Sequence, residues 1–289
     1  MPSLIPASAC STAALVDVLN AGFQDYAVAL HFDPDQYEFF VRSHDIDLDL
    51  SLAAHVGGDL IGIAQLGRRG DCGWVAGVSV RPDHRRHGVA RALMQALAQH
   101  AQEAGLHQLR LEVLYQNDAA RQLYEELGWK VERELLTWSR AADQELLPVP
   151  DEFITEFDPA RLLETCFGWH DQPPCWQRQR ATLRHFPRVG LRGWALVREA
   201  GPVAGPVAYA LGFPPLEGKL RLADVAVDPA VGIRSAGRPL LQALYHSFRQ
   251  AAPQLGNEPV DSHLNHLFFA LGYRVSLRQH EMSLSLKGS

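Results

Sequence analysis

The stretch VSVRPDHRRHGVA, residues 78–90, reads as a strand, a basic turn with a single glycine and the beginning of a helix that continues to about residue 101. A turn that feeds a helix N-terminus leaves several backbone N–H groups without partners, and the positive end of the helix dipole lies beside them. Gly88 lets a ligand approach the backbone where a Cβ would block it. Arg85 and Arg86 add positive charge. The stretch therefore predicts a site for a phosphorylated ligand.

The commonest phosphate loops are excluded by the sequence. It contains no G-x-x-x-x-G-K-[ST] motif, and this turn lacks the three glycines of G-x-G-x-x-G. What remains is [Q/R]-x-x-G-x-[G/A], filled by Arg85, Gly88 and Ala90. So short a pattern also fits an ordinary solvated helix start, and at this point both interpretations stand.

A second segment decides between them. Residues 109–114 alternate like a strand, and residues 117–129, NDAARQLYEELGW, read as a short helix capped by Asn117 or Asp118 and ended by Gly128. With both segments present, the chain resembles the GNAT family of N-acetyltransferases. The V-x-R-P-x-x-R-R-x-G-x-A loop matches its acetyl-coenzyme A loop, although a glycine is frequent where Arg86 stands. The L-E-V, N-x-x-A and L-Y-E-x-L-G-[WF] series matches its second signature.

The resemblance implies acetyl-CoA as the acetyl donor, with no metal. It places the pyrophosphate on the backbone of residues 86–90 and the pantetheine arm along residues 78–80. The donor-binding residues expected in this way are Val78, Ser79, Val80, Arg85, Arg86, His87, Gly88, Val89, Ala90, Arg91, Asn117, Ala120 and Tyr124. His84 and His87, beside the loop, are expected to be solvent-exposed.

Two side chains are candidates for catalysis. Tyr124 matches the family tyrosine that protonates the departing sulfur, and a phenol with a pKa near ~10 keeps its proton at neutral pH. The alternative is an aromatic side chain that packs under the sheet. Glu112 is the best-placed candidate for the base that deprotonates the amine, acting through water. It could instead be a structural partner of the loop arginines.

The chain contains an internal repeat. Residues 76–97 align without gaps on residues 223–244, an offset of 147, with nine of 22 positions identical. Two prolines near residues 148–150 interrupt the segment between the copies. We therefore expect two tandem GNAT domains of the α/β (α+β) class, residues 1–142 and 151–289. Each is expected to have a mixed, mostly antiparallel sheet flanked by helices.

The second copy has lost the motif residues. Gly232, Ser235 and Gly237 stand where the first copy has Arg85, Gly88 and Ala90, and the helix that follows has Phe268 in place of Tyr124 and Asp261 in place of Asn117. This predicts a degenerate, structural second domain. An altered ligand site is the alternative.

Composition bounds the remaining possibilities. The chain has 289 residues, 47% of them hydrophobic, and a formal net charge of −6, which argues against nucleic acid as the main partner. The arginine-rich composition fits a bacterial, GC-rich genome, and no stretch of 18 apolar residues exists. The cysteines Cys10, Cys72, Cys166 and Cys175 lack metal-site spacing, so we expect free thiols in a cytoplasmic protein that binds neither metal nor membrane.

The expected activity is acetyl transfer to a primary amine of a small molecule or peptide, by a monomer or homodimer. A non-catalytic CoA-binding regulatory or interaction module is one alternative, and an acyltransferase with another donor, similar to mycothiol synthase, is another. The acceptor carries no motif. The aromatic residues of segment 21–42 (Phe23, Tyr26, Phe32, Tyr37, Phe39 and Phe40) form either a pocket wall or core. Asp47, Asp49 and Ser51 either line the acceptor groove or form the polar face of an alternating strand.

Overall fold

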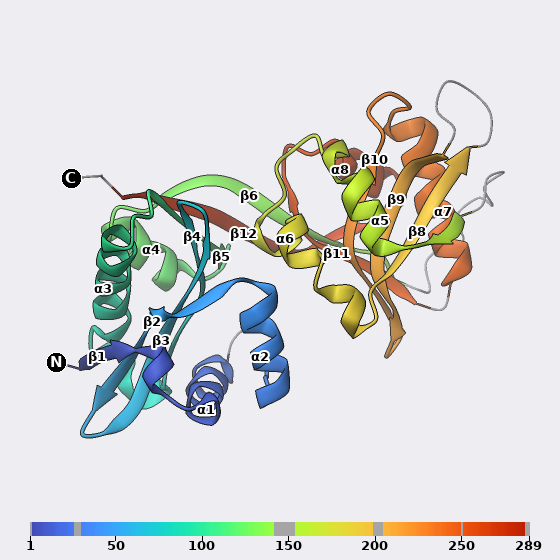
Figure 1. Ribbon diagram of the computed structural model, residues 1–289. Coiled ribbons are helices and arrows are strands. Elements are labelled where there is room, and N and C mark those ends of the chain that lie inside the picture. The colour runs from blue at the N-terminus through green and yellow to red at the C-terminus, as the bar shows by residue number, and fades with distance from the viewer. Residues whose placement is uncertain (1, 26–29, 142–153, 199–204, 250, 287–289) are drawn as a thin grey trace. The chain divides into compact units, whose positions relative to one another are not determined.

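The computed structural model describes residues 2–25, 30–141, 154–198, 205–249 and 251–286 (Figure 1). The chain divides into two compact units. Unit 1 comprises Met1–Glu132 and His280–Ser289, and unit 2 comprises Arg133–Gln279. Each unit is a sheet with helices on both faces.

Unit 1 has its strands in the order β1-β2-β3-β4-β5-β12. These strands are β1 (Ser3–Pro6), β2 (Ile46–Val56), β3 (Asp59–Arg69), β4 (Cys72–Val80), β5 (Gln108–Leu114) and the end of β12 (Arg274–Ser285). The helices are α1 (Thr12–Phe23), α2 (Pro34–Ser43), α3 (Val89–Glu103) and α4 (Asp118–Glu126). Neighbours from β1 to β4 are antiparallel, and β4 and β5 are parallel.

The helices of unit 1 bury apolar stripes on opposite faces of the sheet. Leu93, Met94 and Leu97 of α3 are buried against the face that carries Ala64 and Leu66, as their spacing along one side of a helix requires. The helices α1 and α2 cover the other face, where Ile63 is buried (Figure 1). From the carboxyl end of β4, the loop of residues 81–88 leads to the start of α3.

Unit 2 repeats this plan with the order β12-β6-β11-β10-β9-β8-β7. Its strands are β6 (Lys130–Ser139), β7 (Ile154–Phe157), β8 (Arg192–Arg198), β9 (Gly205–Leu216), β10 (Lys219–Val227) and β11 (Ala252–Pro259), with the first part of β12. Its helices are α5 (Pro159–Thr165), α6 (Arg180–Leu183), α7 (Arg238–Ser247) and α8 (Leu264–Ala270). The parallel pair is again the fourth and fifth strands of the repeat, β10 and β11.

The two repeats exchange their last strands. Strand β6 follows α4 of the first repeat, but most of it belongs to unit 2, where Ser139 pairs antiparallel with Gln254 of β11. Strand β12 follows α8 of the second repeat, but its end belongs to unit 1, next to β5. The predicted limits, 1–142 and 151–289, follow the repeat in sequence, whereas the compact units follow the contacts. The predicted linker lies outside the described residues from residue 142 onwards.

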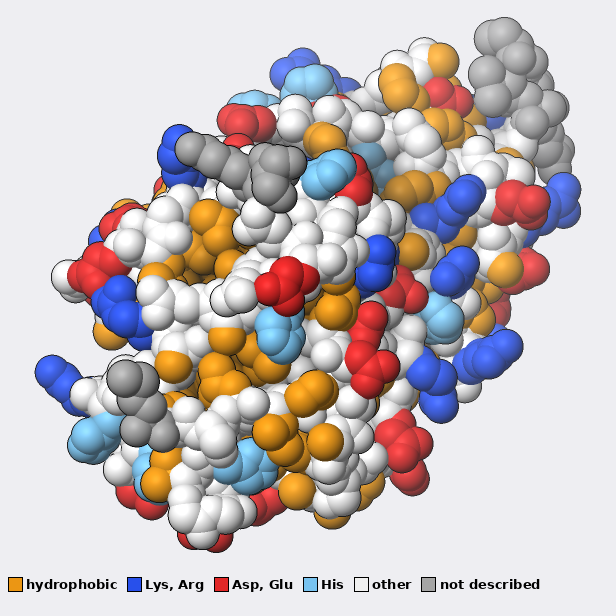
Figure 2. All heavy atoms as spheres, turned by 60° about the vertical axis from the view of Figure 1, so that its left-hand side comes forward, with side chains coloured by type: hydrophobic (Ala, Val, Ile, Leu, Met, Phe, Trp, Pro, Cys, Tyr) orange, Lys and Arg blue, Asp and Glu red, His pale blue; other side chains and the backbone are white. Residues whose placement is uncertain are grey.

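The predicted fold class is confirmed, since each unit has a mixed, mostly antiparallel sheet flanked by helices. No disulfide joins the four cysteines to one another, which agrees with the expected thiols. On the face shown in Figure 2, hydrophobic side chains are exposed in separate groups between charged side chains of both signs. Of the helices in the described ranges, none is long and apolar enough to cross a membrane.

Candidate functional site

In unit 1, strands β4 and β5 pair for only part of their length. Their parallel register covers Cys72–Trp74 of β4, whereas the antiparallel register of β4 with β3 continues to Val80. A register shift at Ala76 bulges β4 at the point where the two strands separate. Within the described part of the chain, residues 75–80 therefore have no strand partner on the β5 side, and their main-chain N–H and C=O groups on that side are available to a ligand.

The loop between β4 and α3 ends in an unusual helix start. Gly88 is the N-cap of α3 with a φ of 78°, and no described side chain caps the helix. By contrast, side chains of Ser11, Asp33 and Asn117 cap α1, α2 and α4. A Cβ at Gly88 would meet no atom within 4 Å, so this position faces open space. The first N–H groups of α3 are consequently not capped by a described side chain, which is the arrangement that suits an anion.

A cavity of about 280 Å³ lies at this helix start. It is lined by Val80, the loop, the first residues of α3, and Ala119 and Leu123 of α4. Arg86, in the loop, has a φ of 64°, the left-handed conformation that glycine adopts most readily. A glycine is frequent at this position in the family that the chain resembles, and the left-handed backbone conformation explains that preference.

The side chain of Arg85 is held by protein groups. It forms two hydrogen bonds with the Asp25 carboxylate (2.7 and 2.8 Å) and donates to the carbonyls of Gly22 (2.9 Å) and Val80 (3.2 Å). The hydrogen bond from Arg85 lowers the pKa of Asp25. Arg85 therefore ties the loop to the end of α1, and its contact with the donor phosphates stays a prediction. In the same loop, Arg86 and His87 are exposed, as expected for His87.

Other predicted donor-site residues also have structural partners. The hydroxyl of Ser79 is buried and donates to the carbonyl of Val18 (2.8 Å), so this side chain is engaged within unit 1. Asn117 accepts from the N–H of Ala120 (3.3 Å) and begins α4. The Arg91 side chain forms an ion pair with Glu126. These contacts position the loop and both helices, and nothing in them conflicts with a donor bound through main chain.

Tyr124 and Glu112, the two catalytic candidates, lie on α4 and β5. Tyr124 is half-buried and its ring packs against Trp129 at a centroid distance of 6.1 Å. Glu112 is also half-buried, and its Oε2 accepts from the indole N–H of Trp74 at 2.7 Å. Trp74 is itself stacked on His44 of the α2 side at 5.6 Å. The geometry gives Glu112 a partner other than the loop arginines, and the catalytic roles of both residues stay predictions.

The comparisons with known proteins agree with this geometry. The family model described as the acetyltransferase (GNAT) family matches residues 15–129. An acetyltransferase of Sodalis glossinidius is 33% identical over 95 residues, which are 33% of this chain and 67% of that protein. One from Yersinia pestis is 32% identical over 105 residues, 36% of this chain and 74% of that protein. The chain belongs to the GNAT family of acetyltransferases.

Solved structures show that the GNAT fold occurs twice. A tandem GNAT protein from the clavulanic acid biosynthesis pathway matches this chain with a TM-score of 0.72 at 15% identity. The match covers 100% of this chain and 100% of that protein. An N-acetyltransferase from Sphaerobacter thermophilus has a TM-score of 0.68 at 19% identity and covers 99% of this chain and 96% of its own. At these identities the likeness concerns the fold, and it confirms the tandem GNAT architecture.

The acidic segment of the first GNAT unit differs from the prediction. Of the two interpretations of Asp47, Asp49 and Ser51, the polar face of a regularly alternating strand does not describe this segment, because the register of β2 with β3 shifts there. Asp47 Oδ1 accepts from the N–H groups of Asp49 (3.0 Å) and Leu50 (3.2 Å), and the fully buried Ser51 hydroxyl accepts from Leu66 N–H (3.0 Å). Asp47 and Ser51 therefore stabilise an irregular strand.

For the aromatic residues of segment 21–42, predicted to form either a pocket wall or core, the structure places Tyr37 in the core. Tyr37 is buried, its hydroxyl accepts from Gln65 (3.0 Å), and burial raises its pKa to about 12. It is a core residue. Phe32 and Phe40 pack against each other at 5.3 Å, and Tyr26 lies outside the described residues.

The GNAT loop of the second unit has a different backbone. Ser235, at the position of Gly88, lies within a π-helical turn, Ile233–Gly237, that precedes α7. Gly237 begins α7 with a right-handed φ of −67°, and a Cβ there would come within 2.9 Å of Leu267. Phe268, at the position of Tyr124, is fully buried and stacked on Trp138. The left-handed N-cap that exposes the amides of α3 is therefore not repeated in α7.

A buried charge network that the sequence analysis missed spans β10 and β11. These strands separate after Leu222 and Leu255, as β4 and β5 do. Beyond that point the Arg178 guanidinium pairs with Asp224 of β10 (2.7 Å) and with Glu258 of β11. All three residues are at most 4% exposed. In the second unit an arginine thus bridges the gap that stays open in the first.

Two more side chains complete this network around Asp224. Tyr209 donates its hydroxyl to Asp224 (2.7 Å), and His170 Nε2 lies 3.0 Å from the same carboxylate. Burial would raise the pKa of Asp224, but His170 and Arg178 together lower it well below its usual range. The available signal in the sequence was Asp224 itself, an acid within the otherwise apolar segment Leu222–Val227.

Proposed function

We propose that unit 1 transfers the acetyl group of acetyl-CoA to a primary amine of a small molecule or peptide. The observation that carries the proposal is the uncapped start of α3 at Gly88, which opens onto the unpaired edge of β4. The amides of residues 86–90 would bind the pyrophosphate, since a helix N-terminus attracts anions. The edge of residues 78–80 would hold the pantetheine amides by main-chain hydrogen bonds.

The reaction then takes place where β4 and β5 separate. A neutral amine attacks the thioester carbonyl, the C–N bond forms and the C–S bond breaks. The departing sulfur takes a proton from Tyr124, and the amine nitrogen gives one up through water to Glu112. Converting the ammonium ion, whose pKa is ~10.4, to the neutral amine at pH 7 costs about 4–5 kcal/mol, so a base positioned to take that proton is useful. The indole of Trp74 would hold the Glu112 carboxylate for this role.

The test measures release of free CoA thiol from acetyl-CoA with a panel of primary amines. We expect turnover with at least one amine, and Tyr124→Phe is expected to lower kcat by about 10²-fold, the low end for general acid catalysis. Tyr115→Phe is the matched control, because Tyr115 is 49% exposed and lies outside the proposed machinery. Equal turnover of the two variants would remove Tyr124 from the mechanism. Binding of CoA without thiol release would establish a binding module in place of an enzyme.

A further inference from the structure

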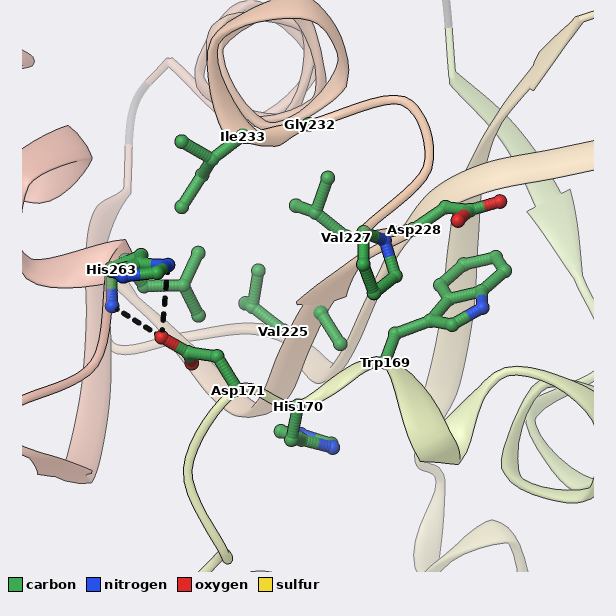
Figure 3. A pocket seen from close by; sticks show the side chains of 12 residues that line it. Trp169, His170, Asp171, Val225, Val227, Asp228, Gly232, Ile233 and His263 are labelled. Carbon is green, nitrogen blue, oxygen red and sulfur yellow. Dashed lines mark hydrogen bonds and ion pairs between the residues drawn. The ribbon is translucent and has the colours of Figure 1, made fainter.

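Unit 2 has a cavity of about 360 Å³ at the place that corresponds to the donor pocket of unit 1. By the repeat offset, Val227, Gly232 and Ile233 in its wall correspond to Val80, Arg85 and Arg86, which line the cavity of unit 1. Figure 3 shows the cavity between β10, the loop that follows it and the start of α8. The cavity of the first repeat has therefore been kept in the second, with a changed lining.

The residues that replace the arginines of the first repeat remove the positive charge from this cavity and add negative charge. Asp228 stands where the first repeat has Arg81, and Gly232 and Ile233 stand where it has Arg85 and Arg86. Asp171 and Asp228 line the cavity, and the described residues of its wall include neither lysine nor arginine. A phosphate would meet two carboxylates and neither lysine nor arginine among the described wall residues, and His170 is already paired with Asp224, so this cavity disfavours the ligand proposed for the first repeat.

Asp228 is the polar group of this wall that lacks a full set of partners. Asp228 is only 9% exposed, and its Oδ1 accepts from the N–H of Ala230 (2.8 Å). In the described part of the chain no hydrogen bond or ion pair engages Oδ2. An acceptor oxygen that has no protein partner, in a residue that is largely buried, is available to a cationic or hydrogen-bonding ligand.

The neighbouring side chains define what such a partner would be. Trp169 lies on the same side of the cavity as Asp228 (Figure 3), and an indole face attracts cations. The rest of the wall is apolar, from Val225, Ile233 and Leu264. Asp171 is already engaged, by the N–H of His263 at 2.7 Å and by the Ser262 hydroxyl at 3.2 Å.

We propose that this cavity binds a primary ammonium group attached to an apolar chain. The ammonium group would pair with Asp228 beside Trp169, and the chain would lie against Val225, Ile233 and Leu264. A six-carbon amine has seven heavy atoms and occupies roughly 200 Å³, at about the 30 Å³ that one water takes in the liquid, so it fits the available volume. This site does not depend on the reaction proposed for unit 1.

The test compares three probes of one shape on the full chain without CoA: n-hexylamine, n-hexanol and hexanoate. Binding is measured by isothermal titration calorimetry and ligand-observed NMR. We expect hexylamine to bind at least about tenfold more tightly than hexanol, and hexanoate not to bind. Equal binding of hexylamine and hexanol, or binding of hexanoate, would overturn the proposal, because the carboxylate would then not select the ligand.

Two variants locate the bound amine. Asp228→Asn keeps the size of the side chain and its acceptor for Ala230, and it should weaken hexylamine binding about tenfold without changing hexanol binding. Ile233→Trp fills the cavity from its half-buried edge and should abolish both. Asp261→Asn, an exposed acid of the same unit, is the control and should change neither. An amine bound elsewhere would be insensitive to both cavity variants, and that result refutes the site even if one variant fails to fold.

Discussion

The left-handed glycine at the start of α3 allows a test in which strain and ligand binding are separated. Helix α3 is flanked by two such glycines, Gly88 with a φ of 78° and Gly105 with a φ of 80°. At both positions an added Cβ would meet no atom within 4 Å. Alanine therefore introduces the same backbone strain at either end of one helix, about 1–2 kcal/mol for a left-handed residue with a Cβ. Only at Gly88 does that Cβ lie in the cavity at the N-terminus.

The expected results follow from this symmetry. Gly88→Ala and Gly105→Ala should lower the free energy of unfolding by similar amounts, about 1–2 kcal/mol, measured by urea denaturation. Gly88→Ala should in addition weaken CoA binding at least about tenfold, a loss of ~1.4 kcal/mol, because the new methyl group occupies the approach to the amides. Gly105→Ala should leave the Kd for CoA within about twofold. Equal Kd values for the two variants in calorimetry would show that CoA does not bind at this helix start.

Three further perturbations test the other contacts. Trp74→Phe removes the indole N–H that holds the Glu112 carboxylate, so kcat/KM should fall, and an unchanged kcat/KM would contradict the role of the base. Arg178→Met leaves the carboxylates of Asp224 and Glu258 without their arginine partner. The free energy of unfolding, measured by urea denaturation, should therefore fall by about 3–5 kcal/mol. A loss below about 1 kcal/mol would show that the network is not stabilising. Burial alone would lower the pKa of His170, but its carboxylate partner raises it above the ordinary 6.5, so its stabilisation is complete below pH ~6.5 and is lost as pH rises through the folded-state pKa. The thermal unfolding midpoint should fall over that range, and His170→Gln should remove this slope.

The contacts of His170 explain why the protonated form of its ring stabilises the folded state. Nδ1 lies 2.8 Å from the carbonyl of Phe167 and Nε2 lies 3.0 Å from the Asp224 carboxylate. Both partners only accept hydrogen bonds, so the protonated ring, in which both nitrogens donate, is the form that satisfies both contacts. Loss of one proton at higher pH therefore removes one of these hydrogen bonds.

Sequence reasoning succeeded where the information is local. The loop of residues 78–90 and the short helix of residues 118–126 are each encoded by consecutive residues, whose turn and capping preferences are independent of distant contacts. The internal repeat predicted the tandem architecture, because two copies of one sequence pattern imply two copies of one fold. The free state of the cysteines followed from their spacing.

The failures concern contacts between residues far apart in the chain. Arg85 meets Asp25 at a separation of 60 residues, and Arg178 meets Asp224 and Glu258 at separations of 46 and 80 residues. No pattern in the sequence links these residues, since the pairing depends on how strands and helices pack. The alternation around Asp47 was misleading for the same reason, because its register with β3 is set by buried hydrogen bonds such as that of Ser51.

The exchange of β6 and β12 has a consequence for biosynthesis. Unit 1 is complete only after residues 280–289 have left the ribosome, 148 residues after residue 132 (280 − 132). At about 5–20 residues per second, this delay is roughly 7–30 s, during which β5 is an open sheet edge of the kind that recruits other chains. A truncation that removes residues 280–289 would therefore damage the unit that contains residues 1–132, and this nascent unit would need protection from aggregation until residues 280–289 emerge.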